Sequence, residues 1–540
     1  VSIGWFGEWD LGLIFVSDPS LRFGDYRGLE DDDTYPSLDG LASFRGDDGQ
    51  YFDFVGRDLG LDSRALELRA GKQGKFEFRA HYSEIPRYQG YNTQTPYLGV
   101  GTDTLTLPQP WTYDQPTLEQ SLTPVPLDSS RETIGAGLTF KMGSAWKYEA
   151  DFERQSRDGS RAFSGGLFAL GAALFPAPVD YSTDLFDMAL EFAGKRGSLR
   201  LGFAGSEFDN DNRSISWDNP FDTGFGDAVS RSALEPDNEF HQFSLAGAFR
   251  FSPRFRISGK AAFGEMEQSE PFLPYSINPN FSDLTLPRSS LDGKIDSEIL
   301  NLSGRVYIRL ADRLDLTAQY KVNDRDNQTP VDIYTPVLLE VFNMGQRSNR
   351  PYSYKRTQEK LELRFRAKNR VRLNAGLKRD TMERSYQSVS ETDEDSYWGE
   401  VQFSPSPWMS ARFKVENLER GITPYEQLEG NGRTENPLMR KFNLAERDRD
   451  RVTLELDLSP TNRMGVSFSF YTTEDEYGAS VLGLTSSQED SFSVDLNFAA
   501  SEKANFYVFA NHDEIESNMS AADGIGASPW DAATADTIKT

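Results

Sequence analysis

The sequence predicts an all-β protein, a large antiparallel up-and-down transmembrane β-barrel. Three observations lead to this fold class. Apolar and polar residues alternate in many segments, tight turns alternate with long polar loops, and no apolar run is long enough for a membrane helix. The longest nearly apolar run, Gly165–Phe175, has about 11 residues, whereas a membrane helix needs roughly 18–20.

The alternation is clearest in Leu361–Ala367, which carries leucine or phenylalanine at positions 361, 363 and 365 and glutamate or arginine between them. Successive side chains of a strand point to opposite faces, so such a segment forms a strand with one apolar and one charged face. The same pattern recurs in Phe243–Phe251, Leu302–Leu310, Val371–Lys378, Val452–Leu458, Met464–Phe470 and Phe492–Phe498.

The connections between these segments are of two kinds that alternate along the chain. Tight turns are expected at 46–49, 71–74, 142–144, 194–197, 252–254, 311–313, 368–370, 404–407, 459–462 and 500–503. Long polar loops are expected at about 84–130, 155–184, 209–239, 266–296, 323–356 and 419–448. All short turns therefore lie at one end of the strands, which predicts short periplasmic turns and long extracellular loops.

These turns predict about 21 visible strands, from Glu8–Val16 to a last one near Asn505–His512, with Ala532–Thr540 as a loop. Residues 1–540 are interpreted as one barrel domain that lacks its C-terminal strands, so more strands are expected in the full chain. A barrel of this size encloses a wide lumen, which something should fill. A soluble β-sandwich or solenoid is the alternative, but sandwiches do not usually segregate loop lengths in this way.

Aromatic residues near strand ends are expected to form the interfacial girdles of a barrel. They are Trp146, Tyr148, Tyr320, Tyr352, Tyr354, Trp398, Trp408 and Tyr471.

Composition excludes several functions. The chain has 57 Lys and Arg against 84 Asp and Glu, a net charge of −27, which disfavours nucleic acid as a partner. It has no cysteine, and so cannot form disulfides, cysteine-ligated metal centres or c-type haem attachments. Aromatic residues make up 13% of the chain, which argues against disorder.

No catalytic, cofactor-binding or metal site is predicted. His81, His241 and His512 lie on separate strands and are interpreted as ordinary strand residues. The acidic clusters Glu30–Asp33, Asp209–Asn212 and Glu391–Asp395 are interpreted as solvated loops, with loop Ca²⁺ as the alternative.

Several motifs resemble the decahaem-associated outer-membrane β-barrel family, also called the MtrB/PioB family. They occur in the first 110 residues, and the hairpin spacing extends the likeness to the end of the chain. The motifs are Trp9–Leu13, Val16–Asp18, Phe23–Leu29, Asp58–Arg64, Tyr82–Arg87, Thr95–Gly101 and Leu105–Pro108.

The resemblance implies a non-enzymatic protein in the outer membrane of a Gram-negative bacterium, surrounded by its lipid. It implies a sheath for a periplasmic multihaem c-type cytochrome, inserted in the lumen, that carries electrons across the membrane. An extracellular multihaem cytochrome would dock on the loop side. The haems would belong to the partners. The lumen residues expected to face the partner are Arg305, Arg309, Glu362, Arg364, Arg366, Arg372 and Lys378, with a lumen face that contacts only water as the alternative.

A solute porin or a plugged transporter is the competing function. Porins have fewer strands, about 16–18. A plugged receptor needs a globular plug ahead of the barrel, whereas strands here begin near residue 8.

Overall fold

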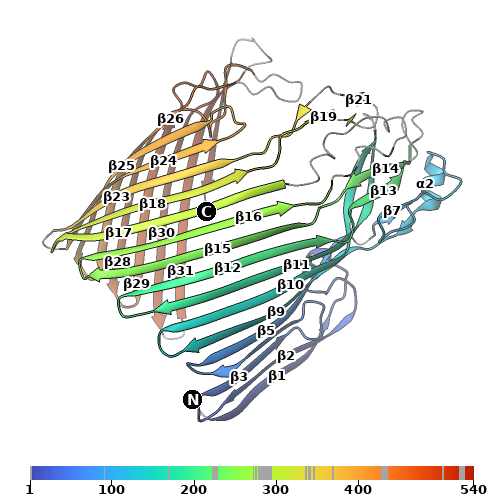
Figure 1. Cartoon of the computed structure of the whole chain (residues 1–540), viewed down its shortest axis with the longest axis horizontal. Coiled ribbons are helices and arrows are strands. Elements are labelled where there is room, and N and C mark those ends of the chain that lie inside the picture. The colour runs from blue at the N-terminus through green and yellow to red at the C-terminus, as the bar shows by residue number, and fades with distance from the viewer. Residues whose placement is uncertain are drawn as a thin grey trace. The chain divides into compact units, whose positions relative to one another are not determined.

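The computed structural model describes residues 3–90, 92–167, 171–221, 229–271, 273, 277, 295–334, 337–338, 342–343, 347–367, 370–426, 436–501, 504–521 and 530–539. The chain is nearly all-β, and the prediction of an antiparallel up-and-down sheet is confirmed (Figure 1). In these residues, no helix has both the length and the apolar character required to cross a membrane.

The chain forms two compact units. Unit 1 comprises Val1–Leu245, Phe263–Glu298 and Asn327–Pro351. Unit 2 comprises Ala246–Ala262, Ile299–Asp326 and Tyr352–Thr540.

Nine long strands of unit 1 pair in chain order, each antiparallel to the next. Neighbours such as β10, β11 and β12 lie side by side in Figure 1. The strands are β1 (Gly4–Phe15), β2 (Thr34–Arg45), β3 (Gln50–Arg57), β4 (Ala65–Lys72), β5 (Phe76–Gly90), β9 (Leu127–Met142), β10 (Trp146–Leu167), β11 (Gly171–Ala193) and β12 (Gly197–Asn210).

Ten long strands of unit 2 pair in the same antiparallel way. They are β18 (Leu314–Asn327), β23 (Tyr354–Arg366), β24 (Val371–Arg384), β25 (Glu391–Ser406), β26 (Met409–Ile422), β28 (Arg447–Thr461), β29 (Met464–Glu476), β30 (Leu482–Ser501), β31 (Ala504–Ala521) and β32 (Trp530–Lys539).

Three further long strands contribute residues to both units. They are β15 (Asn238–Ser252), β16 (Phe255–Gln268) and β17 (Ile295–Ala311). With the short β27 (Met439–Arg440), the described part of the chain has 23 strands in one sheet. Its 22 long strands are one more than the sequence predicts.

The extra strand is β32. The segment Ala532–Thr540 was predicted to be a loop, and this prediction is wrong, because β32 pairs antiparallel with β31 from His512↔Lys539 to Ala521↔Trp530. Its small polar residues lack the apolar alternation on which the prediction depended.

A second correction concerns the loop predicted over 155–184. Most of it is strand, because β10 and β11 continue as one long hairpin from Trp146↔Phe192 to Leu167↔Gly171. The hairpin extends well beyond the lengths of about 9–11 residues that cross a bilayer. Only the half of the hairpin next to the short turns, near Trp146 and Phe192, has alternating apolar and polar residues. The outer half, near Leu167 and Gly171, was therefore not recognised as strand.

The loop-side segments of unit 1 contain ordered elements of their own. A small sheet joins β7 (Thr104–Leu105), β13 (Ser214–Asp218) and β14 (Val229–Ala233), with α2 (Gln115–Ser121) close by in Figure 1. The other short elements of unit 1 are α1 (Leu21–Gly24), β6 (Gln94–Thr95), β8 (Thr123–Pro124), β19 (Ile333–Tyr334), β20 (Val337–Leu338), β21 (Phe342–Asn343) and β22 (Arg347–Ser348).

Candidate functional site: the charged face of the strands

One face of the unit 2 strands is apolar and exposed. Its large side chains are each 37–47% exposed, although in a folded protein residues of this type are usually buried. A continuous exposed apolar face of this kind is suited to lipid. The residues are Leu361, Leu363, Phe365, Leu373, Leu377, Val401, Phe403, Phe413, Val415 and Leu454.

This apolar band ends before the strands do. Beyond Leu361 and Leu377, the same face of β23 and β24 carries charges, with Glu359 opposite Arg379. Arg379 also pairs with Asp393 on β25 at 3.0 Å, and this hydrogen bond raises the pKa of Arg379. The strands therefore continue past the membrane on the long-loop side, where charged outer residues meet water.

The opposite face of unit 2 carries the seven residues predicted to line the lumen. All seven lie on the same charged face of β17, β18, β23 and β24 as their ion-pair and hydrogen-bond partners. Glu362, for example, pairs with Lys360 at 3.0 Å and Arg364 at 3.3 Å. That these residues face a partner stays a prediction.

Asp315 forms ion pairs with two of the arginines that were predicted to line the lumen. Its carboxylate contacts Arg309 at 3.3 Å and Arg366 at 3.0 Å, and it accepts a hydrogen bond from the Tyr307 hydroxyl at 2.8 Å. Only 8% of the Asp315 side chain is exposed, because these neighbours cover it. Such contacts satisfy a carboxylate that would be costly to bury alone.

Asp380 is the centre of a second cluster, nearer the long-loop side. It accepts from Arg356 at 2.8 Å, Lys378 at 2.7 Å and Gln358 at 2.8 Å. Arg372 donates to Gln402 at 2.8 Å. Both clusters join neighbouring strands, so the charges compensate one another along the wall.

Arg305 of β17 also forms a hydrogen bond with a residue of β18. In the amide orientation that satisfies both groups, it donates to the Gln319 side-chain oxygen at 2.8 Å.

A third cluster lies at the loop-side ends of β25 to β29. Glu394 accepts from Arg420 at 2.7 Å and from Arg447 at 3.4 Å, while Asp475 accepts from Arg449 at 2.6 Å. Burial, followed by the nearby Arg420 and Arg449 charges, lowers the pKa of Arg447. This cluster was not recognised in the sequence, although its charges recur at alternate positions.

Three aromatic residues do not belong to the predicted girdles. One is Tyr354, which has the same parity as Arg356 on the charged face of β23 and donates to Asn323 at 3.5 Å. Trp398 and Tyr471 lie on the charged face, because Trp398 pairs in register with Gly376 and Tyr471 donates to Glu489 at 2.8 Å. The Lys360 ammonium lies 4.7 Å from the Trp398 ring, a favourable cation–π arrangement. Proximity to a strand end was the wrong criterion for assigning an aromatic residue to a girdle. Whether its position in the strand is odd or even decides which face its side chain is on.

Glycine makes room for these inner side chains. A Cβ atom at Gly376 would overlap the indole ring of Trp398, so the ring lies flat across β24. In unit 1, Gly135 and Gly137 of β9 give the same space to His81 and Asp151. The charged side chains therefore lie along the wall instead of projecting from it.

The charged face of unit 1 was missed, since no residue of it was singled out. Arg79 of β5 reaches across β9 to Asp151 of β10 at 2.9 Å, and His81 reaches Glu153 at 3.2 Å. Alternating charges in β4 and β5, with Arg69 and Arg79 in register, were the signal in the sequence.

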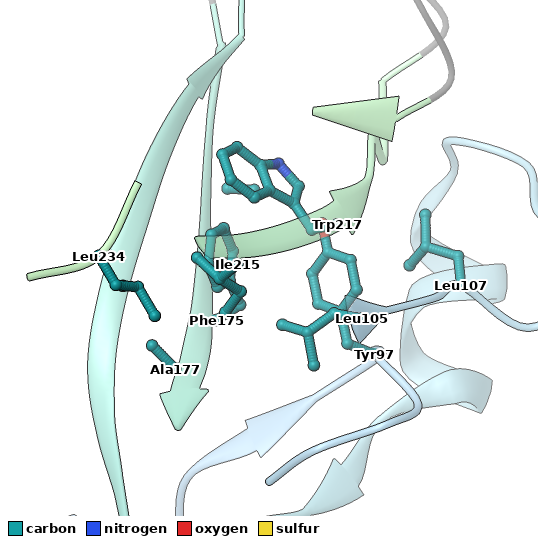
Figure 2. Packing of buried hydrophobic residues seen from close by; sticks show 9 residues of the cluster. Tyr97, Leu105, Leu107, Phe175, Ala177, Ile215, Trp217 and Leu234 are labelled. Carbon is teal, nitrogen blue, oxygen red and sulfur yellow. The ribbon is translucent and has the colours of Figure 1, made fainter. Parts of the chain in front are cut away.

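The predicted long loops of unit 1 contain an unexpected apolar core. Phe175 packs against Tyr97 and Trp217 with ring centroids 5.9 and 4.7 Å apart (Figure 2). The Tyr97 hydroxyl donates to the Asp218 carbonyl at 2.9 Å, and burial raises the pKa of Tyr97. We call this cluster the loop-side cap; it consists of Tyr97, Leu105, Leu107, Ala173, Phe175, Ala177, Ile215, Trp217 and Leu234.

Within the described residues, no group of three or more His, Asp or Glu side chains is arranged to hold a metal ion. The cluster Glu391–Asp395 was predicted to be a loop, but it begins β25, where successive carboxylates point to opposite faces. His241 pairs with Glu239 at 3.3 Å, and His512 lies opposite Phe492 on β31.

Strands with one lipid-facing and one charged face define an outer-membrane β-barrel protein. The model of the outer membrane beta-barrel porin family MtrB/PioB matches residues 16–540. The chain therefore belongs to the MtrB/PioB family, which confirms the resemblance and the outer-membrane location.

The chain is similar to the following relative and solved structures. Outer membrane protein MtrB of Shewanella baltica (strain OS185) is 29% identical over 536 residues, which cover 98% of this chain and 76% of that protein. Among solved structures, the siderophore receptor PirA from Acinetobacter baumannii matches with a TM-score of 0.44 and 8% identity, covering 96% of this chain and 76% of that one. The ferric-catecholate import receptor Fiu from E. coli K12 matches with a TM-score of 0.40 and 9% identity, and the match covers 99% of this chain and 80% of that one.

Proposed function

We propose that this outer-membrane barrel sheathes and positions a multihaem c-type cytochrome, so that electrons cross the outer membrane along the haems of the guest. The observation that carries the proposal is the charged face, whose ion pairs link side chains within a strand and between neighbouring strands. Such a wall is wet, nearly self-neutral and smooth, which suits a protein guest in the lumen.

The chain would supply position and insulation, and the guest would supply the redox groups. With no cysteine, the chain cannot attach a c-type haem itself. The proposal assigns it no catalytic step. The lipid-facing side chains would hold the sheath in the membrane, and a low-dielectric wall would separate the haems from lipid.

The loop-side cap would serve an extracellular multihaem cytochrome. Its apolar core is packed between the extended β10–β11 hairpin and the small β7–β13–β14 sheet. A packed core keeps such a surface in one conformation, which lowers the entropic cost of docking.

The test is purification from the native membrane in mild detergent, followed by haem staining and a visible absorption spectrum. We expect a haem-containing partner in constant ratio to the barrel, and little conductance of the complex in planar bilayers. A haem-free preparation with a stable open conductance would instead establish a solute porin, the function that the family's description as porins favours.

A further inference from the structure

A recess of about 480 Å³ opens on the charged face of unit 1, at the short-turn end of the strands. Residues of β2, β3, β4, β5, β9 and β10 line it, together with the turn that follows β4. Short turns face the periplasm in outer-membrane barrels, so the recess lies at the periplasmic end of the inner wall. Its cationic residues are Arg45, Lys72, Lys75, Arg79, Lys141 and Lys147.

The three carboxylates of the recess are already engaged. Asp53 pairs with Arg45 at 2.8 Å. Glu77 accepts from the Tyr51 hydroxyl at 2.6 Å, and Glu149 contacts Lys147 at 3.1 Å. None of these carboxylates lies within 4.0 Å of the two remaining lysines.

Those lysines are Lys75 and Lys141, both exposed, and no carboxylate of the described residues forms an ion pair with either. The Lys141 amide donates to the Lys75 carbonyl, 2.6 Å away, so the two side chains start from adjacent positions on neighbouring strands. Lys141 is also directly opposite Lys147 in the β9–β10 register.

Like charges in directly opposed positions of a sheet are destabilising. Lys147 is compensated by Glu149 and Glu191, each at 3.1 Å, so the uncompensated like charges are those of Lys75 and Lys141, in a chain whose net charge is −27. A bound anion would relieve this repulsion. Lipid phosphates are not available to it, because the recess opens on the face opposite the exposed apolar side chains.

We propose that this recess binds a carboxylate-rich segment of the periplasmic guest, with Lys75 and Lys141 as its two uncompensated cations. The inference rests on the proposed function, because it concerns where the guest is held. Charge complementarity of this kind governs encounter rate and salt dependence, and fixes the register of a partner.

The first experiment uses the purified full chain in detergent and a fluorescently labelled hexaglutamate peptide as the probe. The variant Lys75→Glu/Lys141→Glu should bind the probe about tenfold more weakly than the unsubstituted chain, with a smaller salt dependence. Lys75→Gln/Lys141→Gln, which introduces no new charge, should show a smaller loss in the same direction.

The matched control is Lys260→Glu/Lys321→Glu. These two exposed lysines also have no ion pair within the described residues, they lie on the charged face of unit 2, and they do not line the recess. The control changes net charge equally, so its affinity should stay within about twofold. Equal losses in both double variants, or no probe binding by the unsubstituted chain, would overturn the recess as a site.

A second experiment measures haem recovered with each variant from native membranes. We expect the Lys75/Lys141 variant to lose haem and the Lys260/Lys321 control to retain it. Equal recovery from both would overturn the recess proposal and leave the sheath function standing. Absence of haem with the unsubstituted chain would instead overturn the sheath function, and the peptide titration would then decide the recess alone.

Discussion

Replacing Leu363 by arginine tests which face of the strands meets lipid. Leu363 lies between Leu361 and Phe365 in the middle of the apolar band of β23, and it is 42% exposed. An arginine at the bilayer midplane of a barrel costs about 2–4 kcal/mol. The folding equilibrium should therefore fall roughly 30- to 700-fold.

The control is the neighbouring substitution Arg364→Leu on the charged face. Arg364 is half exposed and pairs with Glu362 at 3.3 Å, while Glu362 keeps Lys360 at 3.0 Å. An exposed pair of this kind contributes at most about 1 kcal/mol.

The assay is urea unfolding in lipid vesicles, followed by tryptophan fluorescence, with the heat-dependent gel shift of folded barrels as a second readout. The reasoning fails if Arg364→Leu destabilises the protein as much as Leu363→Arg does.

Three further substitutions probe the inner wall, the cap and its hairpin. Gly376→Ala should push the Trp398 ring from its place on β24, costing about 1–3 kcal/mol and shifting the tryptophan emission; an unchanged spectrum would contradict the packing. Phe175→Ala should cost the loop-side cap about 3–5 kcal/mol, seen as faster proteolysis of the loops with unchanged urea unfolding of the strands. Burial, and then the nearby Asp211 carboxylate, raise the pKa of Asp180, so the folded hairpin gains stability as the pH falls through that pKa and loses it at higher pH. Asp180→Asn should therefore slow hydrogen exchange in the outer half of β11 at pH 7, and the difference from the unsubstituted chain should shrink as the pH falls.

Alternation in the sequence was enough to predict the membrane-crossing strands and their two faces. In a strand with one face toward lipid and the other toward water, the residue types alternate with the environment. Leucine and phenylalanine occur on the lipid side, and charged residues occur on the water side. Leu361–Ala367 shows this, since every odd position there is apolar and every even position is charged. The seven residues of the charged face were predicted from the same alternation of odd and even positions, and they do lie together on one face.

The outer half of the β10–β11 hairpin could not be predicted in this way. The sequence Gly165–Phe175 has no charged residues to alternate, and Ala173 and Phe175 within it are buried in the loop-side cap. A Cβ at Gly165 would overlap the ring of Trp217, a residue about fifty positions later in the chain. Contacts between segments so far apart depend on tertiary packing, which single-segment periodicity does not reveal.

On the proposed function, the pairing of charges within the inner wall limits what the paired residues can contribute to the choice of a partner. Asp315 is covered by cations of the two neighbouring strands, and Asp380 by Arg356 of β23 and Lys378 of its own strand, so these inner-face clusters of unit 2 would present little uncompensated charge to a guest. A surface that satisfies its own charges gains little by pairing with others, since a new ion pair must first break an old one. Discrimination between guests must therefore come from groups without such partners. Lys75 and Lys141 are of this kind at the short-turn end, so on the proposed function we expect that end to contribute to the recognition of a guest.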